Sequence, residues 1–210
     1  MAITYPISFP SQFMESLRVL EQNTVSTSIS PFTKRRFSQR YDGELWLLSV
    51  TMPPLRRELA QPVLAFISSL RGPHGSFIVP HPGHSISLGT AATVPSTPLV
   101  NGAGQEGAQT LLIRSAPVDQ VGWLLAGDMI QVGPNTRPHW HRVLQDVDTD
   151  SSGEAEIDVW PQLRENTLDG DAVSYTDPLC LFELEDSPPP HEIGRPVQYL
   201  INLEAREKLA

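Results

Sequence analysis

The clearest pattern of apolar and polar positions in this chain of 210 residues lies between residues 41 and 80. Residues 44–52 alternate in polarity, which predicts a half-buried β-strand. The apolar face of this strand comprises Trp46, Leu48, Val50 and Met52. Pro53 and Pro54 should end the strand, because neither residue can donate a hydrogen bond to a neighbouring strand.

Residues 55–70 then carry apolar side chains at helical spacing, which predicts an amphipathic helix. An interior proline costs a helix about 3 kcal/mol. We therefore expect the regular helix to begin near Gln61, so that Pro62 falls in the first turn, where its missing N–H is harmless. A longer helix, kinked at Pro62, is the alternative. Gly72 and Pro73 should end the helix, and residues 77–79 predict a short return strand.

Residues 1–40 are expected to be mostly extended, because they are rich in β-branched and small polar residues. This segment ends in a basic cluster of four residues around Phe37, namely Lys34, Arg35, Arg36 and Arg40. One interpretation is a solvated loop or an edge strand protected by charge. The other is a contact surface for an acidic neighbour. These four cations are therefore the candidate oligomer or partner contacts.

The middle of the chain predicts a second β-rich unit. Residues 81–110 contain many prolines and glycines, which indicates a linker with at most one short strand, at residues 85–88. Beyond it, short apolar runs separated by turn signals predict a small β-barrel or sandwich. The expected strands are residues 110–114, 128–132, 139–145, 155–160 and 179–184. The third and fourth should pair across a polar turn that ends at Gly153.

Residues 197–204 alternate in polarity again, and we expect this strand to pair with residues 43–52. The predicted fold class is therefore mainly β, with an α+β core unit. That unit would be a β-sheet or split barrel with one packed helix, built discontinuously from residues 1–84 and 191–210. An inserted small β-barrel or sandwich domain would occupy residues 85–190.

Charge supports this division, because the net charge is +3 over residues 1–84, −12 over residues 85–190 and zero over residues 191–210. The acidic middle argues against nucleic-acid binding through that surface, since phosphate contacts need Lys and Arg. The sequence contains no apolar run of the roughly 18 residues that a membrane span requires, and we expect no secretory signal. The single cysteine, Cys180, excludes an internal disulfide and is read as a buried structural thiol rather than a reactive one.

Three aspartates imitate the start of a calcium-binding loop: Asp146, Asp148 and Asp150. The match then fails, because Ser151 replaces the required glycine and Ile157 replaces the bidentate glutamate. A polar turn with solvated carboxylates is the favoured interpretation, and calcium binding is the alternative.

His139 and His141 should point to one face of a strand, where they could ligate zinc if a third ligand joined them. That ligand could be an aspartate or one of three histidines, which are His74, His81 and His84. Ordinary strand and loop residues are the alternative. Three tryptophans could form a sugar-binding platform or fill the core: Trp123, Trp140 and Trp160. No motif for a catalytic nucleophile, a metal site or a cofactor emerges from the sequence.

Several stretches together resemble the distal tail or baseplate-hub proteins of long-tailed bacteriophages. They are residues 44–56, 70–73, 77–82, 125–133 and 148–157, followed by the strand before Glu204. The resemblance implies a non-enzymatic virion protein, without catalytic residues or cofactors, that is assembled in the host cytoplasm. It would form a ring, expected to be a hexamer, that contacts the tail tube, the baseplate hub or tail fibres and the tape-measure protein. The inserted domain would face outward, and glycan recognition by that domain is the alternative function.

Overall fold

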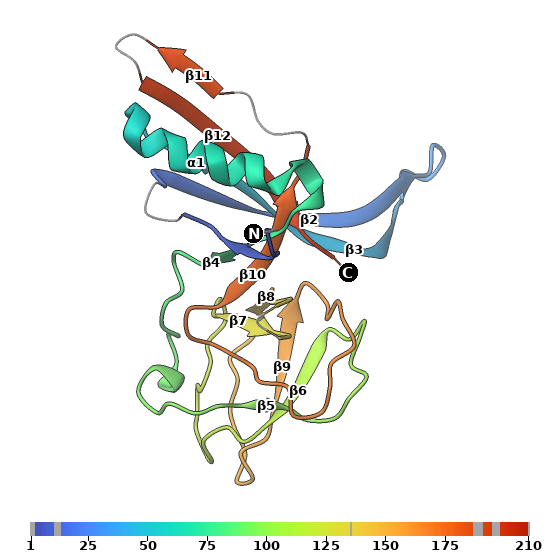
Figure 1. Ribbon diagram of the computed structural model, residues 1–210. Helices are drawn as coiled ribbons and strands as arrows, with labels where there is room; N and C mark the ends of the chain where they lie inside the picture. The colour runs from blue at the N-terminus through green and yellow to red at the C-terminus, as the bar shows by residue number, and fades with distance from the viewer. Residues whose placement is uncertain (1–2, 11–13, 135, 187–190, 195–197, 210) are drawn as a thin grey trace.

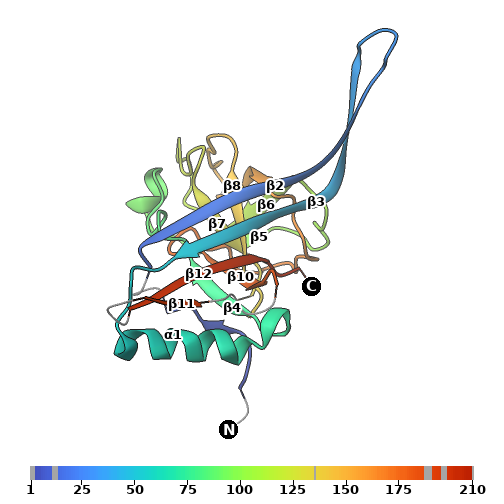
Figure 2. The same ribbon diagram turned by 90° about the horizontal axis from the view of Figure 1, so that it is seen from above.

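The computed structural model describes residues 3–10, 14–134, 136–186, 191–194 and 198–209. These residues form two β-sheets and one α-helix, which confirms the predicted mainly β fold with a packed helix. In Figure 1 the helix and the first sheet occupy the upper part of the molecule, and the second sheet lies below them. Part of the first sheet also projects far beyond the rest of the protein (Figure 2).

Seven of the described strands make up the first sheet. In spatial order they are β1 (Ile7–Ser8), β4 (Phe77–Pro80), β10 (Leu179–Leu184), β12 (Gln198–Glu207), β3 (Arg36–Thr51) and β2 (Ser16–Ile29), with β11 (His191–Gly194) paired to β12. Strand β12 runs antiparallel to β3 and places Leu203 opposite Val50. The prediction that the C-terminal strand returns to residues 43–52 is therefore confirmed.

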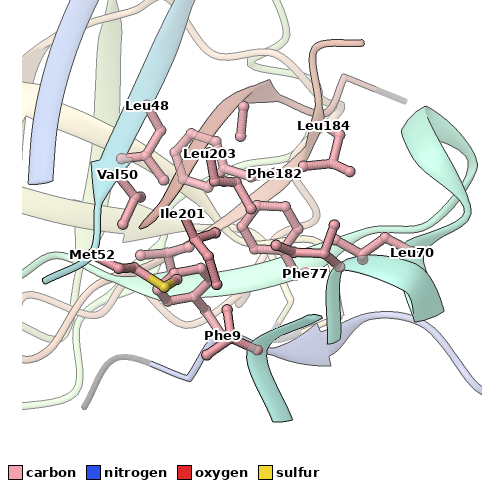
Figure 3. Close-up of a cluster of buried hydrophobic side chains, with 14 of the residues drawn as sticks. Phe9, Leu48, Val50, Met52, Leu70, Phe77, Phe182, Leu184, Ile201 and Leu203 are labelled. Atoms are coloured by element: carbon pink, nitrogen blue, oxygen red, sulfur yellow. The ribbon is translucent and has the colours of Figure 1, made fainter. Parts of the chain in front are cut away.

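The alternation in β3 sets the position of the main core. Its four predicted core residues are all buried, whereas Leu45, Leu47 and Ser49 on the opposite face are only half-buried. Phe77 of β4 and Phe182 of β10 join this core with ring centroids 6.3 Å apart (Figure 3). Because complete burial of one such side chain contributes about 1.5–3 kcal/mol, this cluster is the main source of stability in the first sheet.

Helix α1 (Arg57–Leu70) packs on this core with Ala60, Val63, Ile67 and Leu70. The helix begins at Arg57, so the prediction of a start near Gln61 is wrong, and Pro62 lies inside the helix. The early start is explained by Ala60, which is fully buried in this core and whose N–H donates to the Arg56 carbonyl at 2.9 Å. The ring of Pro62 itself is on the exposed side of the helix. The predicted end is confirmed, since Arg71 and Gly72 adopt positive φ angles of 53° and 70°.

The second sheet contains five of the described strands in the order β5, β6, β9, β8 and β7. Their bounds are β5 (Leu99–Val100), β6 (Thr110–Arg114), β9 (Ala155–Trp160), β8 (His139–Val143) and β7 (Met129–Val132). The predicted pairing of β8 with β9 is confirmed by the register of Val143 opposite Val159. This sheet has its own core, which includes Leu111, Ile130 and Ile157.

Two sequence-based assignments in this region are wrong. Residues 179–184 do not complete the second sheet, because β10 lies between β4 and β12 of the first sheet. Its unbroken apolar run suits a central strand that is covered on both faces. Residues 85–88 do not form a strand either. Instead, the Ser87 hydroxyl and the Leu88 N–H donate to the buried carboxylate of Asp128 at 3.0 and 2.8 Å.

The predicted linker at residues 81–110 is also more ordered than expected. It contains a short 3₁₀ helix, η3 (Thr90–Ala92), and β5 pairs with β6. Ala91 and Val100 are buried in the core of the second sheet. The pairing of β5 with β6 and the burial of Ala91 and Val100 therefore hold this segment to the protein.

Candidate interaction surface

The distal half of the β2–β3 hairpin forms an arm that projects from the molecule (Figure 2). We define the arm as residues 24–41. Apart from half-buried Ser30, every residue from Leu20 to Asp42 is exposed to solvent. A two-stranded ribbon without a packed face is only marginally stable in water. The arm therefore receives little support from the rest of its own chain.

Local sequence explains why the arm still forms a regular hairpin. Residues 24–29 are β-branched or small polar residues, which favour extended backbone. At the tip, the Ser30 N–H donates to the Arg35 carbonyl, and the Lys34 N–H donates to the Ser30 carbonyl, both at 2.9 Å. Lys34 takes a positive φ of 56°, which closes the turn. The tip is thus a defined turn.

The base of the arm is attached to the second sheet. The indole N–H of Trp160 donates to the Asn23 side chain at 2.9 Å, and Arg142 forms an ion pair with Glu21. The strand register shifts between Gln22 and Thr24, and such a bulge bends and twists a hairpin. These contacts and the bulge fix the direction in which the arm leaves the protein.

The side chains on the arm combine exposed apolar groups with positive charge. Phe32 at the tip is 94% exposed, Phe37 is 64% exposed and Ile29 is 62% exposed. All four predicted contact residues lie on the arm, with Lys34 and Arg35 in the turn and Arg36 and Arg40 on β3. Arg40 also forms an ion pair of 2.8 Å with buried Glu44. An exposed hairpin that carries both apolar and cationic side chains is the candidate surface for binding another molecule.

Strand β2 has a second property that suits association. It is the last strand in the spatial order of the first sheet, and it is 14 residues long. A long edge strand presents unpaired backbone N–H and C=O groups to a neighbouring chain. The arm and this edge together form a continuous surface along β2.

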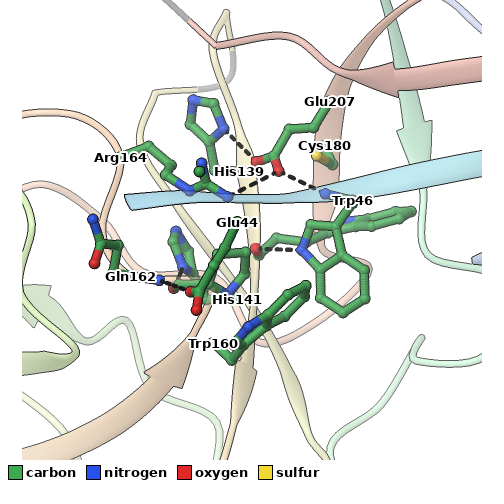
Figure 4. A network of polar contacts seen from close by, with 12 residues as sticks. Glu44, Trp46, His139, His141, Trp160, Gln162, Arg164, Cys180 and Glu207 are labelled. Atoms are coloured by element: carbon green, nitrogen blue, oxygen red, sulfur yellow. Dashed lines mark hydrogen bonds and ion pairs between the residues drawn. The ribbon is translucent and has the colours of Figure 1, made fainter. Parts of the chain in front are cut away.

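A buried polar cluster joins the two sheets (Figure 4). His139 Nδ1 of β8 lies 2.8 Å from Glu207 Oε1 of β12, and the second carboxylate oxygen of Glu207 accepts the Trp46 N–H at 3.1 Å. Arg164 lies 3.8 Å from the same carboxylate. The indole N–H of Trp46 donates to the Trp140 carbonyl at 2.9 Å, so both sheets share these contacts.

Burial controls the chemistry of this cluster. Desolvation lowers the pKa of the Arg164 guanidinium, and it lowers the pKa of His141 to about 4. His141 is consequently neutral at pH 7, and its Nδ1–H can donate to the Pro161 carbonyl at 2.7 Å. Burial also raises the pKa of the Cys180 thiol, which keeps it protonated. The predicted buried thiol is therefore confirmed, and the cluster holds the sheets together.

The histidine candidates do not converge on a metal site. His139 contacts Glu207, whereas His141 contacts the backbone, and both rings are buried. His81 and His84 lie near each other in the segment after β4, with ring centroids 4.6 Å apart. The described residues contain no group of three or more histidine, cysteine or acidic side chains with the spacing of a metal site.

The three aspartates of the imitated calcium loop instead stabilise loops of the second sheet. Asp146 accepts the Ala126 N–H at 2.9 Å, and Asp148 accepts the Gly122 N–H at 2.6 Å. Asp150 accepts two N–H groups of its own turn, which lowers the pKa of its carboxyl group. The three carboxylates thus face different backbone segments, as expected for the polar turn.

The tryptophan candidates are used for packing. Trp123 and Trp140 are fully buried, so neither ring can stack on a sugar. Trp160 is half-buried and packs against Trp46 with ring centroids 4.6 Å apart. The proposed sugar platform is therefore excluded for Trp123 and Trp140.

Sequence reasoning found the cations of the arm and Phe37 among them, but it missed Phe32 and Ile29. Phe32 and Ile29 stand among serines, threonines and prolines, where no periodicity marks them as exposed. Their position a few residues before the basic cluster was the only signal that could have linked them to the same surface. Sequence reasoning also missed Glu207, which looks like a charged residue at an exposed strand end but is only 2% exposed.

No protein-family model matches this chain, and no curated protein matches its sequence. Within the described residues, no helix has the length and apolar character needed to cross a membrane.

Proposed function

We propose that this chain is a structural protein of a phage tail tip that assembles into a ring of identical subunits. The ring, expected to be a hexamer, would join the tail tube to the baseplate hub or the tail fibres. The observation that supports this proposal most is the projecting arm of residues 24–41 with its exposed Phe32, Phe37 and Ile29. This role is structural and assigns no reaction to the chain.

The arm favours assembly for an energetic reason. Burying exposed apolar surface against another molecule contributes about 25 cal/mol for each Å². The arm makes few contacts with its own chain, so a neighbouring molecule can cover it without displacing packed side chains. Its bend and its anchored base also limit the conformational entropy that is lost when it docks.

The arm also suits a ring of identical subunits. If each arm docks on the next subunit without a reciprocal exchange, the contact is heterologous, and heterologous contacts generate rings when the rotation closes. The long edge of β2 can add backbone hydrogen bonds to the same contact. A tail tube has the same cyclic character, which connects this assembly to the family that the sequence resembles.

The experiment that tests this proposal combines sedimentation with electron microscopy of the purified chain, alone and mixed with the tail tube protein from the same genome. We expect rings in at least one of these samples. In an arm-deleted variant, Asn-Gly replaces residues 26–39, because Val25 and Arg40 face each other and that turn suits two-residue hairpins. This variant should fold and form no rings.

A matched control reverses two cations elsewhere, Arg56→Glu and Arg57→Glu, at the start of helix α1. This control should assemble like the natural chain. A chain that stays monomeric in both samples and does not bind the tail tube protein would contradict the proposal. A tape-measure gene beside the gene for this chain would give independent support.

A further inference from the structure

We propose that the tip of the arm docks into an acidic groove on the second sheet of a neighbouring copy of this chain. This inference rests on the proposed ring and adds which surfaces meet. The acidic groove has a volume of about 480 Å³. Its lining residues are Asn101, Leu112, Ile113, Asp148, Thr149, Asp150, Glu154, Ala155 and Glu156.

Charge complementarity is the first argument. Residues 22–41 contain four cationic residues and no aspartate or glutamate. The groove carries four exposed carboxylates, and none of its nine lining residues is cationic. The backbone N–H groups that Asp150 accepts lower its pKa, so that carboxylate keeps its charge in mildly acid solution. Opposite charges on the arm and the groove steer the two surfaces together.

The apolar groups match as well. Phe32 at the tip is 94% exposed, and Leu112 in the groove is 40% exposed between the acidic side chains. An aromatic anchor that fills a pocket inside a polar rim is the usual composition of a strong interface contact. Lys34 and Arg35 follow Phe32 closely in the turn, so one insertion can place the ring and the cations together.

A neighbouring copy is favoured over the same chain because the two surfaces lie apart in one molecule. The arm leaves the upper part of the molecule, whereas β6 and β9, which contribute Leu112 and Glu156, lie in the lower part (Figure 1). Nucleic acid is the alternative partner of the arm, because bases stack on aromatic residues that lie beside cations. A second copy is nevertheless favoured. Nucleic acid would meet the net charge of −12 on residues 85–190, and this charge would repel it.

Disulfide capture provides the test. One variant carries Thr33→Cys, at an exposed position beside Phe32 that leaves the ring in place. A second carries Glu156→Cys, and the two are mixed under oxidising conditions. Natural Cys180 is buried, and its raised thiol pKa keeps it unreactive. We expect the mixed disulfide to form at least tenfold faster than with Val121→Cys, an exposed control position in the same part of the chain. Equal rates for Glu156→Cys and Val121→Cys would overturn the inference.

A charge swap gives the matched control. Reversing Lys34, Arg35 and Arg36 to Glu in the Thr33→Cys variant should slow capture at least tenfold. Reversing Glu154 and Glu156 to Lys should slow it similarly when Asp150→Cys replaces Glu156→Cys as the groove partner. Combining both reversals should restore the rate to within about threefold, because the charge pairs are re-formed with opposite polarity. Failure of this rescue contradicts the inference.

The outcomes separate this inference from the proposed function. If rings form and are unchanged by Glu154→Lys and Glu156→Lys, the ring stands and the arm docks elsewhere. If the arm binds a DNA oligonucleotide and gives no capture above the control, nucleic acid is its partner and the inference is wrong. If neither rings nor capture are observed, both proposals fail.

Discussion

The ring of His139 lies 2.8 Å from the carboxylate of Glu207, and this contact joins β8 of the second sheet to β12 of the first sheet. Glu207 is only 2% exposed, although it stands in an alternating strand near the C-terminus. Its two oxygens are shared between the His139 ring and the Trp46 N–H. One buried carboxylate thus contributes to fixing the relative position of the two sheets, together with the Trp46–Trp140 hydrogen bond.

The first prediction concerns this carboxylate. Glu207→Ala should lower the free energy of unfolding by about 3 kcal/mol, because it leaves the backbone N–H of Trp46 without its acceptor and Arg164 without its buried counter-ion. Glu204→Ala removes an exposed carboxylate from the same strand and should change stability by less than about 0.5 kcal/mol. Urea unfolding followed by tryptophan fluorescence measures both values. Equal effects of the two substitutions would contradict this assignment.

The second prediction concerns pH. Burial lowers the pKa of His141 to about 4 in the folded chain, whereas an unfolded histidine titrates near 6.5. Between these values the unfolded state binds the proton and the folded state does not. Stability is therefore fully present above about pH 6.5 and falls by about 3 kcal/mol as the pH approaches 4.

His141→Gln should reduce this slope, which unfolding curves measured between pH 7 and 4 can show. Burial and neighbouring His84 also lower the pKa of His81 to about 4, so a smaller slope should remain and should decrease further in the double variant with His81→Gln. Exposed His74→Gln is the control and should leave the slope unchanged. An unaltered slope in His141→Gln would show that this histidine is not buried neutral.

The third prediction concerns the proline inside helix α1. Pro62 is exposed, and it removes the N–H that would bond to the Glu58 carbonyl. Pro62→Ala should raise the free energy of unfolding by about 1 kcal/mol, since the gain in helix propensity exceeds the added entropy of the unfolded chain. Ser68→Ala, at an exposed position of the same helix, should add less than about 0.5 kcal/mol. Thermal unfolding of the two variants measures these changes. A Pro62→Ala variant less stable than the natural chain would contradict the prediction.

The fourth prediction concerns the turn before β9. Gly153 has a φ of 72°, and a Cβ atom there would lie 2.3 Å from the Ala116 carbonyl oxygen. Gly153→Ala should therefore destabilise the chain by about 2 kcal/mol or more, through both the left-handed backbone and the clash. Exposed Ser152→Ala in the same turn should be nearly neutral. Calorimetry of the two variants checks this difference.

Local patterns predicted which residues form strands and helices better than they predicted which strands pair with each other. Alternation identified β3 and β12 and even their pairing, because a half-buried strand has one face that must be covered. The same reasoning failed for β10, whose continuous apolar run fits a central strand of either sheet. It also failed for Pro62, because burial of Ala60 compensates for a proline that local propensity would exclude.

The candidate interaction surface was likewise predicted only in part from the sequence. The four cations of the arm could be named from the sequence, since charge clusters are visible without a fold. The exposure of Phe32 depends on how far the hairpin extends beyond the sheet, and that length is set by long-range pairing of β2 with β3. Burial of Glu207 likewise arises from a contact between residues 68 positions apart.

Val79 of β4 lies directly opposite Cys180 of β10, so the chain enters and leaves the second sheet through two adjacent strands. Topologically, everything between these strands is the loop of one antiparallel hairpin. Loops of this kind can change length at a modest entropic cost. Related chains could thus exchange the entire second sheet for another module, or for a short turn, while the first sheet keeps its strand order. The junction at Glu207 would then be the place where each new module has to adapt.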